Sequence, residues 1–157
     1  MKNIITVVLI SFLSITVNAQ YGVDNIFRKY KNDKGVIAWQ FEGDISKILK
    51  TKDGSEIKST LESVDFVMFS EDMDITDKDK GKLKERIASD KYEMLVQARD
   101  KGQNIKIMGI EEGDTIKKVF AQLKYEKMSA YFFLTGKIYL EDLNNINYDS
   151  LMEGLDF

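Results

Sequence analysis

The sequence predicts an α+β fold, a mainly antiparallel β-sheet with helices packed on one face. Two observations support this class. Apolar residues recur at helical spacing mainly in the first half of the chain, whereas the second half alternates short apolar runs with turns of 2–4 residues, the length that hairpins favour. The predicted order is therefore helix, strand, helix, strand, helix and then a β-meander, which is typical of an α+β sandwich.

Three helices are expected before the meander. The first covers 23–30, where apolar residues fall at i, i+3, i+4 and i+7. The second follows Asp44, a residue type that caps helices. The third follows Thr76, which forms a capping-box-like start with Asp79, and it runs to about Asp90. The apolar faces consist of Val23, Ile26, Phe27 and Tyr30, then Ile45, Ile48 and Leu49, and then Leu83, Ile87 and Ala88.

Short apolar runs, separated later in the chain by turns at Gly102 and Gly113, predict the strands. The run 92–98 fits either more helix or a strand. Single helical turns are expected over 57–61 and 141–146. The predicted strands are 36–41, 64–69, 105–110, 116–123 and 130–134. Four later apolar residues either dock on the body of the domain or stay loose: Leu151, Met152, Leu155 and Phe157.

The start of the chain has the pattern of a secretory signal peptide. Lys2 supplies a positive charge, residues 4–17 form an uncharged apolar stretch, and Val17-Asn18-Ala19 places small residues where signal peptidase cleaves. Cleavage after Ala19 leaves a single domain over 20–157. The alternative is an uncleaved anchor, but the apolar stretch is shorter than the ~20 residues that a membrane span needs. We expect an exported protein, periplasmic or extracellular, with no membrane span after cleavage.

Composition excludes several classes of function. The chain has no His, no Cys and no Pro, so it cannot hold a Cys/His zinc site, a thiol nucleophile, a disulfide or a Ser-His-Asp triad. The missing Cys also excludes lipoprotein acylation. A formal net charge of −3 argues against nucleic-acid binding, which needs clustered basic charge. The chain has no Gly-rich phosphate cradle, and we expect no cofactor and no catalytic residues.

An acidic stretch before the third helix is the only candidate for metal binding. Carboxylates in such numbers suit a hard cation such as Ca²⁺. The EF-hand pattern fails, however, because Asp77 stands where glycine is required and Leu83 where the closing Glu is required. A solvated loop that places negative charge at a helix N-terminus is therefore the favoured interpretation. The weak metal candidates are Asp72, Asp74, Asp77 and Asp79.

Aromatic residues in the predicted strands suggest an interaction surface. Consecutive residues of a strand point to opposite faces, so Phe132 and Phe133 must lie on different sides of the sheet. If helices cover only one face, one of these rings is left on the other, where aromatic patches mark binding sites. Trp39 is the third candidate residue for this surface.

The order and spacing of aromatic, aliphatic and glycine positions resemble the DUF4252 family, small exported proteins of Bacteroidetes. The resemblance covers nearly all of the domain, and it implies an envelope domain of unknown function with no catalytic residues to carry over. The residues that carry it are Asn25, Phe27 and Tyr30, Gly35 and Val36, Tyr92, Glu93 and Leu95, Gln103, Ile105 and Ile107, Phe133 to Gly136, Ile138, Leu140 and Leu143.

Three hypotheses of function remain. The preferred hypothesis is a non-enzymatic interaction or regulatory module whose partner is an unidentified envelope protein. The alternatives are a small carboxylate- or Ca-dependent hydrolase and a periplasmic carrier of a small ligand, for which methionine residues would suit an adaptable lining.

Overall fold

The computed structural model describes residues 22–44, 51–70, 73–100, 102–125 and 127–145. The expected signal peptide, the expected helix after Asp44 and the candidate metal ligand Asp72 lie outside these residues, as does the segment that carries Leu151 to Phe157. None of the described helices has both the length and the hydropathy that crossing a membrane requires.

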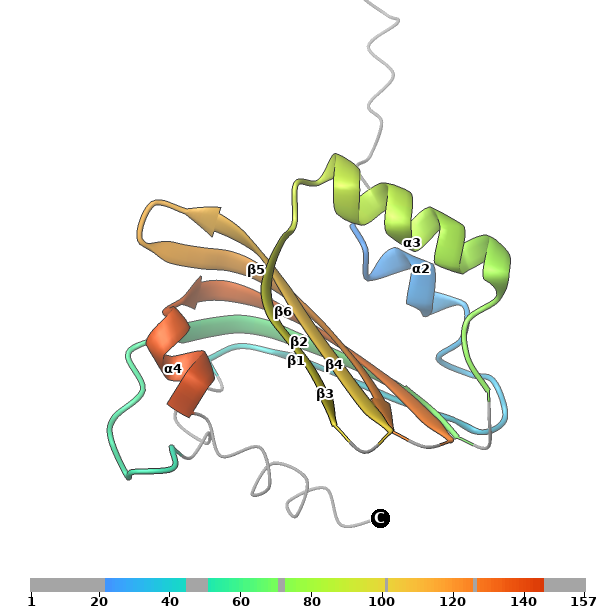
Figure 1. Cartoon of the computed structure of the whole chain (residues 1–157), viewed down its shortest axis with the longest axis horizontal. Coiled ribbons are helices and arrows are strands. Elements are labelled where there is room, and N and C mark those ends of the chain that lie inside the picture. Colours follow the sequence, from blue (N-terminus) through green and yellow to red (C-terminus); the bar gives the residue numbers. More distant parts are fainter. Residues whose placement is uncertain (1–21, 45–50, 71–72, 101, 126, 146–157) are drawn as a thin grey trace, which may run out of the picture.

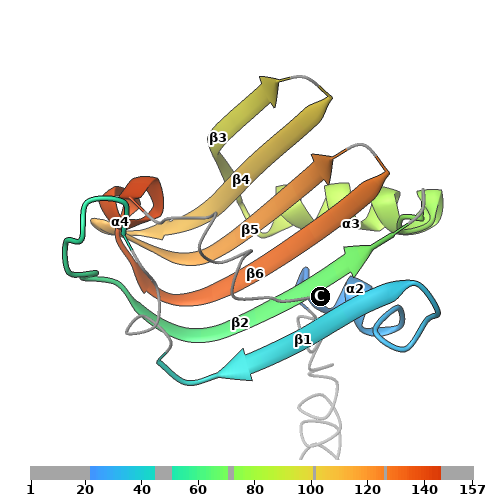
Figure 2. The same cartoon turned by 90° about the horizontal axis from the view of Figure 1, so that it is seen from below.

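A six-stranded antiparallel sheet forms the body of the domain (Figure 1). Figure 2 shows the strand order β1-β2-β6-β5-β4-β3, in which the last four strands of the chain form the expected meander. The strands are β1 (Val36–Glu42), β2 (Thr60–Phe69), β3 (Glu93–Asp100), β4 (Gln103–Glu112), β5 (Thr115–Tyr125) and β6 (Met128–Ile138). Because β2 pairs with β6, the second strand lies beside the last strand, and β1 is left at one edge.

The described residues form three helices, which lie on the two faces of this sheet. α2 (Asn25–Arg28) and α3 (Asp77–Ser89) cover one face, which we call the helix-covered face, and α4 (Leu140–Asn145) packs against the opposite face, which we call the second face (Figure 1). The α+β class is confirmed. The expectation that the helices share one face is wrong for α4, because Leu143 packs with apolar side chains of the second face.

The start of α3 follows the sequence pattern. The Thr76 hydroxyl caps the helix by accepting a hydrogen bond from the Asp79 backbone N–H at 3.3 Å. Asp90 is the C-cap, as expected. α2 is shorter than the 23–30 pattern suggests, but Val23, just before it, and Phe27, within it, are both buried.

Two local expectations are settled by strand pairing. The helical turn expected over 57–61 is wrong, because Thr60 and Leu61 belong to β2, where Leu61 is buried and pairs with Gly136. The segment 92–98, left open between helix and strand, forms most of β3 and pairs with β4. For 57–61 the partner strand β6 is far away in the sequence, and for 92–98 it is the next strand, β4. In both cases the hydrogen bonds come from outside the segment, so its local pattern does not contain them.

Gly136 has a structural reason to be glycine. Its φ is +150°, and an added Cβ would lie 2.1 Å from the Thr60 carbonyl oxygen, closer than any side chain tolerates. The site lies beside an irregularity in the β2–β6 register between Leu61 and Ser63. A glycine at this position lets the two backbones approach closely.

Alternation along the strands divides the apolar side chains into two clusters. The larger cluster fills the space between the helix-covered face and the helices α2 and α3 and is rich in aromatic rings: Phe27, Tyr30, Phe69, Phe120, Tyr131 and Phe133. The smaller cluster lies on the second face and is mostly aliphatic: Leu61, Val64, Ile116, Val119, Ile138 and Leu143.

Candidate functional site

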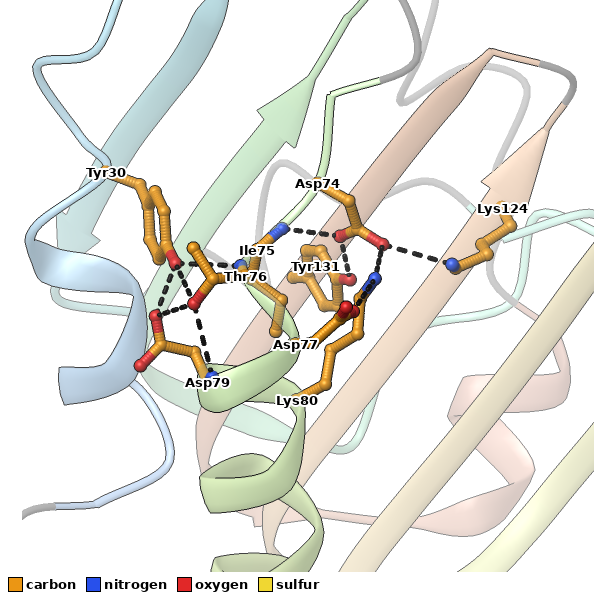
Figure 3. A network of polar contacts seen from close by, with 9 residues as sticks. All are labelled: Tyr30, Asp74, Ile75, Thr76, Asp77, Asp79, Lys80, Lys124 and Tyr131. Atoms are coloured by element: carbon orange, nitrogen blue, oxygen red, sulfur yellow. Dashed lines mark hydrogen bonds and ion pairs between the residues drawn. The ribbon is translucent and has the colours of Figure 1, made fainter.

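The acidic stretch before α3 forms a network of polar contacts with the sheet and with the segment that follows α2 (Figure 3). Asp79 is its most buried carboxylate, at 2% exposure. The Tyr30 hydroxyl and the Thr76 hydroxyl both donate to Asp79 Oδ2, the second at 2.9 Å. Lys29 Nζ lies 2.5 Å from the same oxygen. The hydrogen bonds from Lys29 and then Tyr30 hold the pKa of Asp79 well below its usual range, although burial opposes them.

Asp74 occupies the other half of the network. The Tyr131 hydroxyl donates to Asp74 at 2.5 Å, and Lys124 Nζ lies 3.1 Å and Lys80 Nζ 3.5 Å from its second oxygen. Burial alone would raise the pKa of Asp74, but the bonds from Tyr131 and Lys124 outweigh it and lower the pKa. Burial and then the bond to Asp74 raise the pKa of the Tyr131 hydroxyl. This carboxylate therefore ties the loop before α3 to two strands of the sheet.

The three metal candidates that the structure describes, Asp74, Asp77 and Asp79, do not converge on one point. Asp79 and Asp74 each bind hydroxyls and ammonium groups of the protein, and exposed Asp77 pairs with Lys80 at 3.4 Å. In the described part of the chain, no group of three His, Cys, Asp or Glu side chains is arranged to hold a metal ion. The carboxylates of this network are neutralised by ammonium groups and hydrogen-bonded by hydroxyls of the protein itself. This arrangement suits a structural role, in which the network holds the helix against the sheet.

Two hollows border the helices on the helix-covered face. One, of about 360 Å³, lies between α2 and α3 and has Lys29 and Asp79, an ion pair, in its lining. The other, of about 220 Å³, lies between the α2 segment and the sheet and includes Asp65 and Thr135. Asp65 is paired with Lys31 at 2.7 Å. Sequence reasoning missed this polar site, although Asp65 inside an apolar strand was an available signal.

The three aromatic candidates are divided between the two faces. Phe133 lies on the helix-covered face, where its ring centroid is 4.9 Å from that of Phe27. Trp39 and Phe132 lie on the second face, one on each side of Phe66, with centroid distances of 5.2 and 4.6 Å. The expected opposition of Phe132 and Phe133 is present, and Phe133 belongs to the core rather than to a surface.

The strand β1 brings further apolar residues to the edge of the sheet. Ile37 and Phe41 share the face of Trp39 by alternation, and they are 37% and 43% exposed. The Trp39 indole N–H is buried and has no hydrogen-bond acceptor among the described residues. On its outer side, β1 has no partner strand in the described part of the chain. Sequence reasoning missed Ile37, Phe41 and Phe66, although the alternation in 36–41 could have placed the first two beside Trp39.

The opposite edge of the sheet differs in its side chains. β3 carries Glu93, Gln97 and Arg99, and its register with β4 is shifted beside Leu95. Charged side chains and irregular pairing are the features with which proteins prevent further strands from adding to an edge. β1 has charge only at its end, in Glu42.

Comparison with known proteins gives a family without an assigned activity. The family model described as "Domain of unknown function (DUF4252)" matches residues 30–146, which includes all six strands. No curated protein and no solved structure matches the chain. The match covers well over half of the sequence, and it confirms the resemblance found in the spacing of aromatic and glycine positions. The chain belongs to the DUF4252 family.

Proposed function

We propose that this chain is an exported, non-enzymatic interaction module of the cell envelope, and that it binds an extended segment of an envelope protein along β1. Export is supported by the pattern of residues 1–19, and the missing Cys supports a protein without a lipid anchor. A non-enzymatic role is supported by the absence of His and Cys and by the engagement of Asp74 and Asp79 within the protein.

The observation that carries the proposal is the character of the β1 edge. An edge strand offers unpaired backbone N–H and C=O groups, and a partner strand gains affinity from them. Ile37 and Phe41 offer exposed apolar surface on the same strand. A partner that adds a strand here pairs with the free backbone groups and covers this apolar surface at once.

The chemistry of the edge describes the partner segment. It is extended, and it places apolar side chains at alternate positions opposite Ile37 and Phe41. Methionine residues give little support to the alternative of a ligand carrier, because Met108 is buried among core rings while Met73, Met94 and Met128 are exposed.

Site-specific photo-crosslinking in cells tests the proposal, with a matched control on the opposite edge. A crosslinking amino acid replaces Phe41 on β1 in one strain and Met94 on β3, which is 49% exposed, in another. We expect one dominant crosslinked envelope protein from position 41 and none from position 94. The substitution Ile37→Lys in the first strain should abolish this crosslink.

Equal crosslinking from both edges, or none from position 41, would overturn the proposal. Persistence of the product in the Ile37→Lys strain would also contradict it, because the apolar edge would then not be the determinant of binding.

A further inference from the structure

The centre of the second face is occupied by a ring that is almost completely buried. Phe66 is 1% exposed. The rings that the structure places against it, Trp39 and Phe132, stand on the two neighbouring strands, in register with it. Neighbours on adjacent strands contact a sheet residue from its two sides along the sheet. A ring in the middle of a face that is only 1% exposed therefore points to a further layer above the sheet.

The described residues supply such a layer only at one end of this face. Leu143 of α4 packs with Val64 and Val119. These residues stand two positions before Phe66 and Ala121 on their strands, in the neighbouring row of the same face. The face itself is apolar along the strands, because alternation brings these side chains to it: Ile37, Trp39 and Phe41 from β1, Val64, Phe66 and Met68 from β2, Ala130, Phe132 and Leu134 from β6, and Val119, Ala121 and Leu123 from β5.

α4 is held firmly in place, which fixes where the following residues start. Buried Asp142 accepts three hydrogen bonds at its Oδ2 atom, from the backbone N–H groups of Lys58 and Ser59 and from the Ser59 hydroxyl. The Asn145 carbonyl accepts from the Lys52 N–H at 2.8 Å. Segment 146–157 therefore leaves from the second face.

The sequence of segment 146–157 is amphipathic. Tyr148, Leu151, Met152 and Leu155 fall at i, i+3, i+4 and i+7, the spacing of one helical face. The acidic residues Asp149 and Glu153 lie between these positions, and Asp156 follows the last of them. Twelve residues in a helix reach about 18 Å, and the four strands of the Trp39–Phe66–Phe132–Ala121 row span about 14 Å at the usual strand spacing.

We propose that segment 146–157 packs its apolar stripe on the second face, above Phe66 and between Trp39 and Phe132, and is the layer that buries this ring. The acidic residues then face solvent. This inference goes beyond the proposed function, because it concerns the isolated chain and leaves Ile37 and Phe41 at the β1 edge accessible.

The single Trp of the chain reports on this face directly, because Trp39 stands beside Phe66. The double substitution Leu151→Asp and Leu155→Asp, made in the chain without its signal peptide, should shift Trp39 emission to longer wavelength and raise acrylamide quenching several-fold. Glu153→Ala, in the same segment but between the apolar positions, is the matched control and should leave both unchanged. Circular dichroism verifies that each variant is folded.

A synthetic peptide of residues 146–157, added as a separate molecule, gives a second test with the same fluorescence measurements. It contains no Trp, so its addition to the double variant should restore the emission and the quenching of the unsubstituted chain. The peptide that carries both Asp substitutions should not. Restoration by neither peptide would overturn the proposal, as would unchanged Trp39 fluorescence in the double variant.

A nitroxide label covers the case in which the double variant fails to fold. The chain has no Cys, so Gly154→Cys labels a single site, and contact with the second face should quench Trp39 strongly. The same label at Lys78→Cys, exposed on α3, should quench weakly. Equal quenching from both sites would overturn the proposal. So would a dimer in solution whose dissociation alone exposes Trp39, because a second copy would then be the cover.

Discussion

The two faces of the sheet bury apolar side chains in different ways. The helix-covered face packs aromatic rings against α2 and α3, and carboxylates of Asp74 and Asp79 fix those elements to the sheet and to each other. The second face is mostly aliphatic apart from the Trp39–Phe66–Phe132 row, and among the described elements it has only α4, held by Asp142. The difference indicates that stability is concentrated on the first face, while the second face and its β1 edge are available for contacts with other segments.

The largest loss of stability should follow a substitution in the aromatic core of the helix-covered face. Phe120 is fully buried, and its ring centroid lies 5.2 Å from that of Phe133. Phe120→Ala should lower the free energy of unfolding by about 3–5 kcal/mol, the cost of lost burial and a cavity. Urea denaturation measures this, with Leu123→Ala, half-buried on the same strand but on the second face, as control. An equal loss in both variants would contradict the contrast between the faces.

Removal of the charge of Asp79 should have an intermediate effect on the free energy of unfolding. Asp79→Asn keeps the size of the side chain but removes the charge that Lys29, Tyr30 and Thr76 share. The loss should be about 2 kcal/mol at pH 7, the scale of hydrogen bonds to a buried charged group. Asp77→Asn, on an exposed aspartate two residues earlier in the same helix, is the control and should change little.

The pH dependence of the free energy of unfolding tests whether the charge of Asp79 causes this loss. The folded-state pKa of Asp79 is lowered, so its contribution is present above the unfolded value of about 3.9 and is lost as the pH falls below it. The difference between the unsubstituted chain and Asp79→Asn should therefore shrink from pH 6 toward pH 2. A constant difference across that range would show that the charge of Asp79 is not the source of the stability.

The smallest effect should come from the β1 edge. Phe41 is exposed and lies outside both buried clusters, so Phe41→Lys should change the free energy of unfolding by less than about 0.5 kcal/mol. The same denaturation assay measures it, and the variant should lose partner binding in cells. A loss of several kcal/mol would mean that Phe41 serves the fold, and the β1 edge would then no longer contrast with the core.

Local patterns in the sequence predicted the elements whose causes are local. The Thr76–Asp79 pair placed the start of α3, and turns at Gly102 and Gly113 placed the hairpins of the meander. The segment 57–61 was mistaken for helix, and 92–98 stayed ambiguous, because their strand partners are β6 and β4. The acidic stretch was recognised as a helix start, but the partner of Asp74 is Tyr131, 57 residues away, and no spacing rule finds it.

By itself, the sequence determined the α+β class, the family, the exclusion of His and Cys chemistry and the opposition of Phe132 and Phe133. Each depends on composition or on the fixed periods of helix and strand. Only the tertiary structure decided that Phe133 faces α2, that Trp39 meets Phe132 across Phe66, and that α4 takes the second face. Alternation separates two faces without saying which one a helix will cover, because that choice depends on how well distant surfaces pack together.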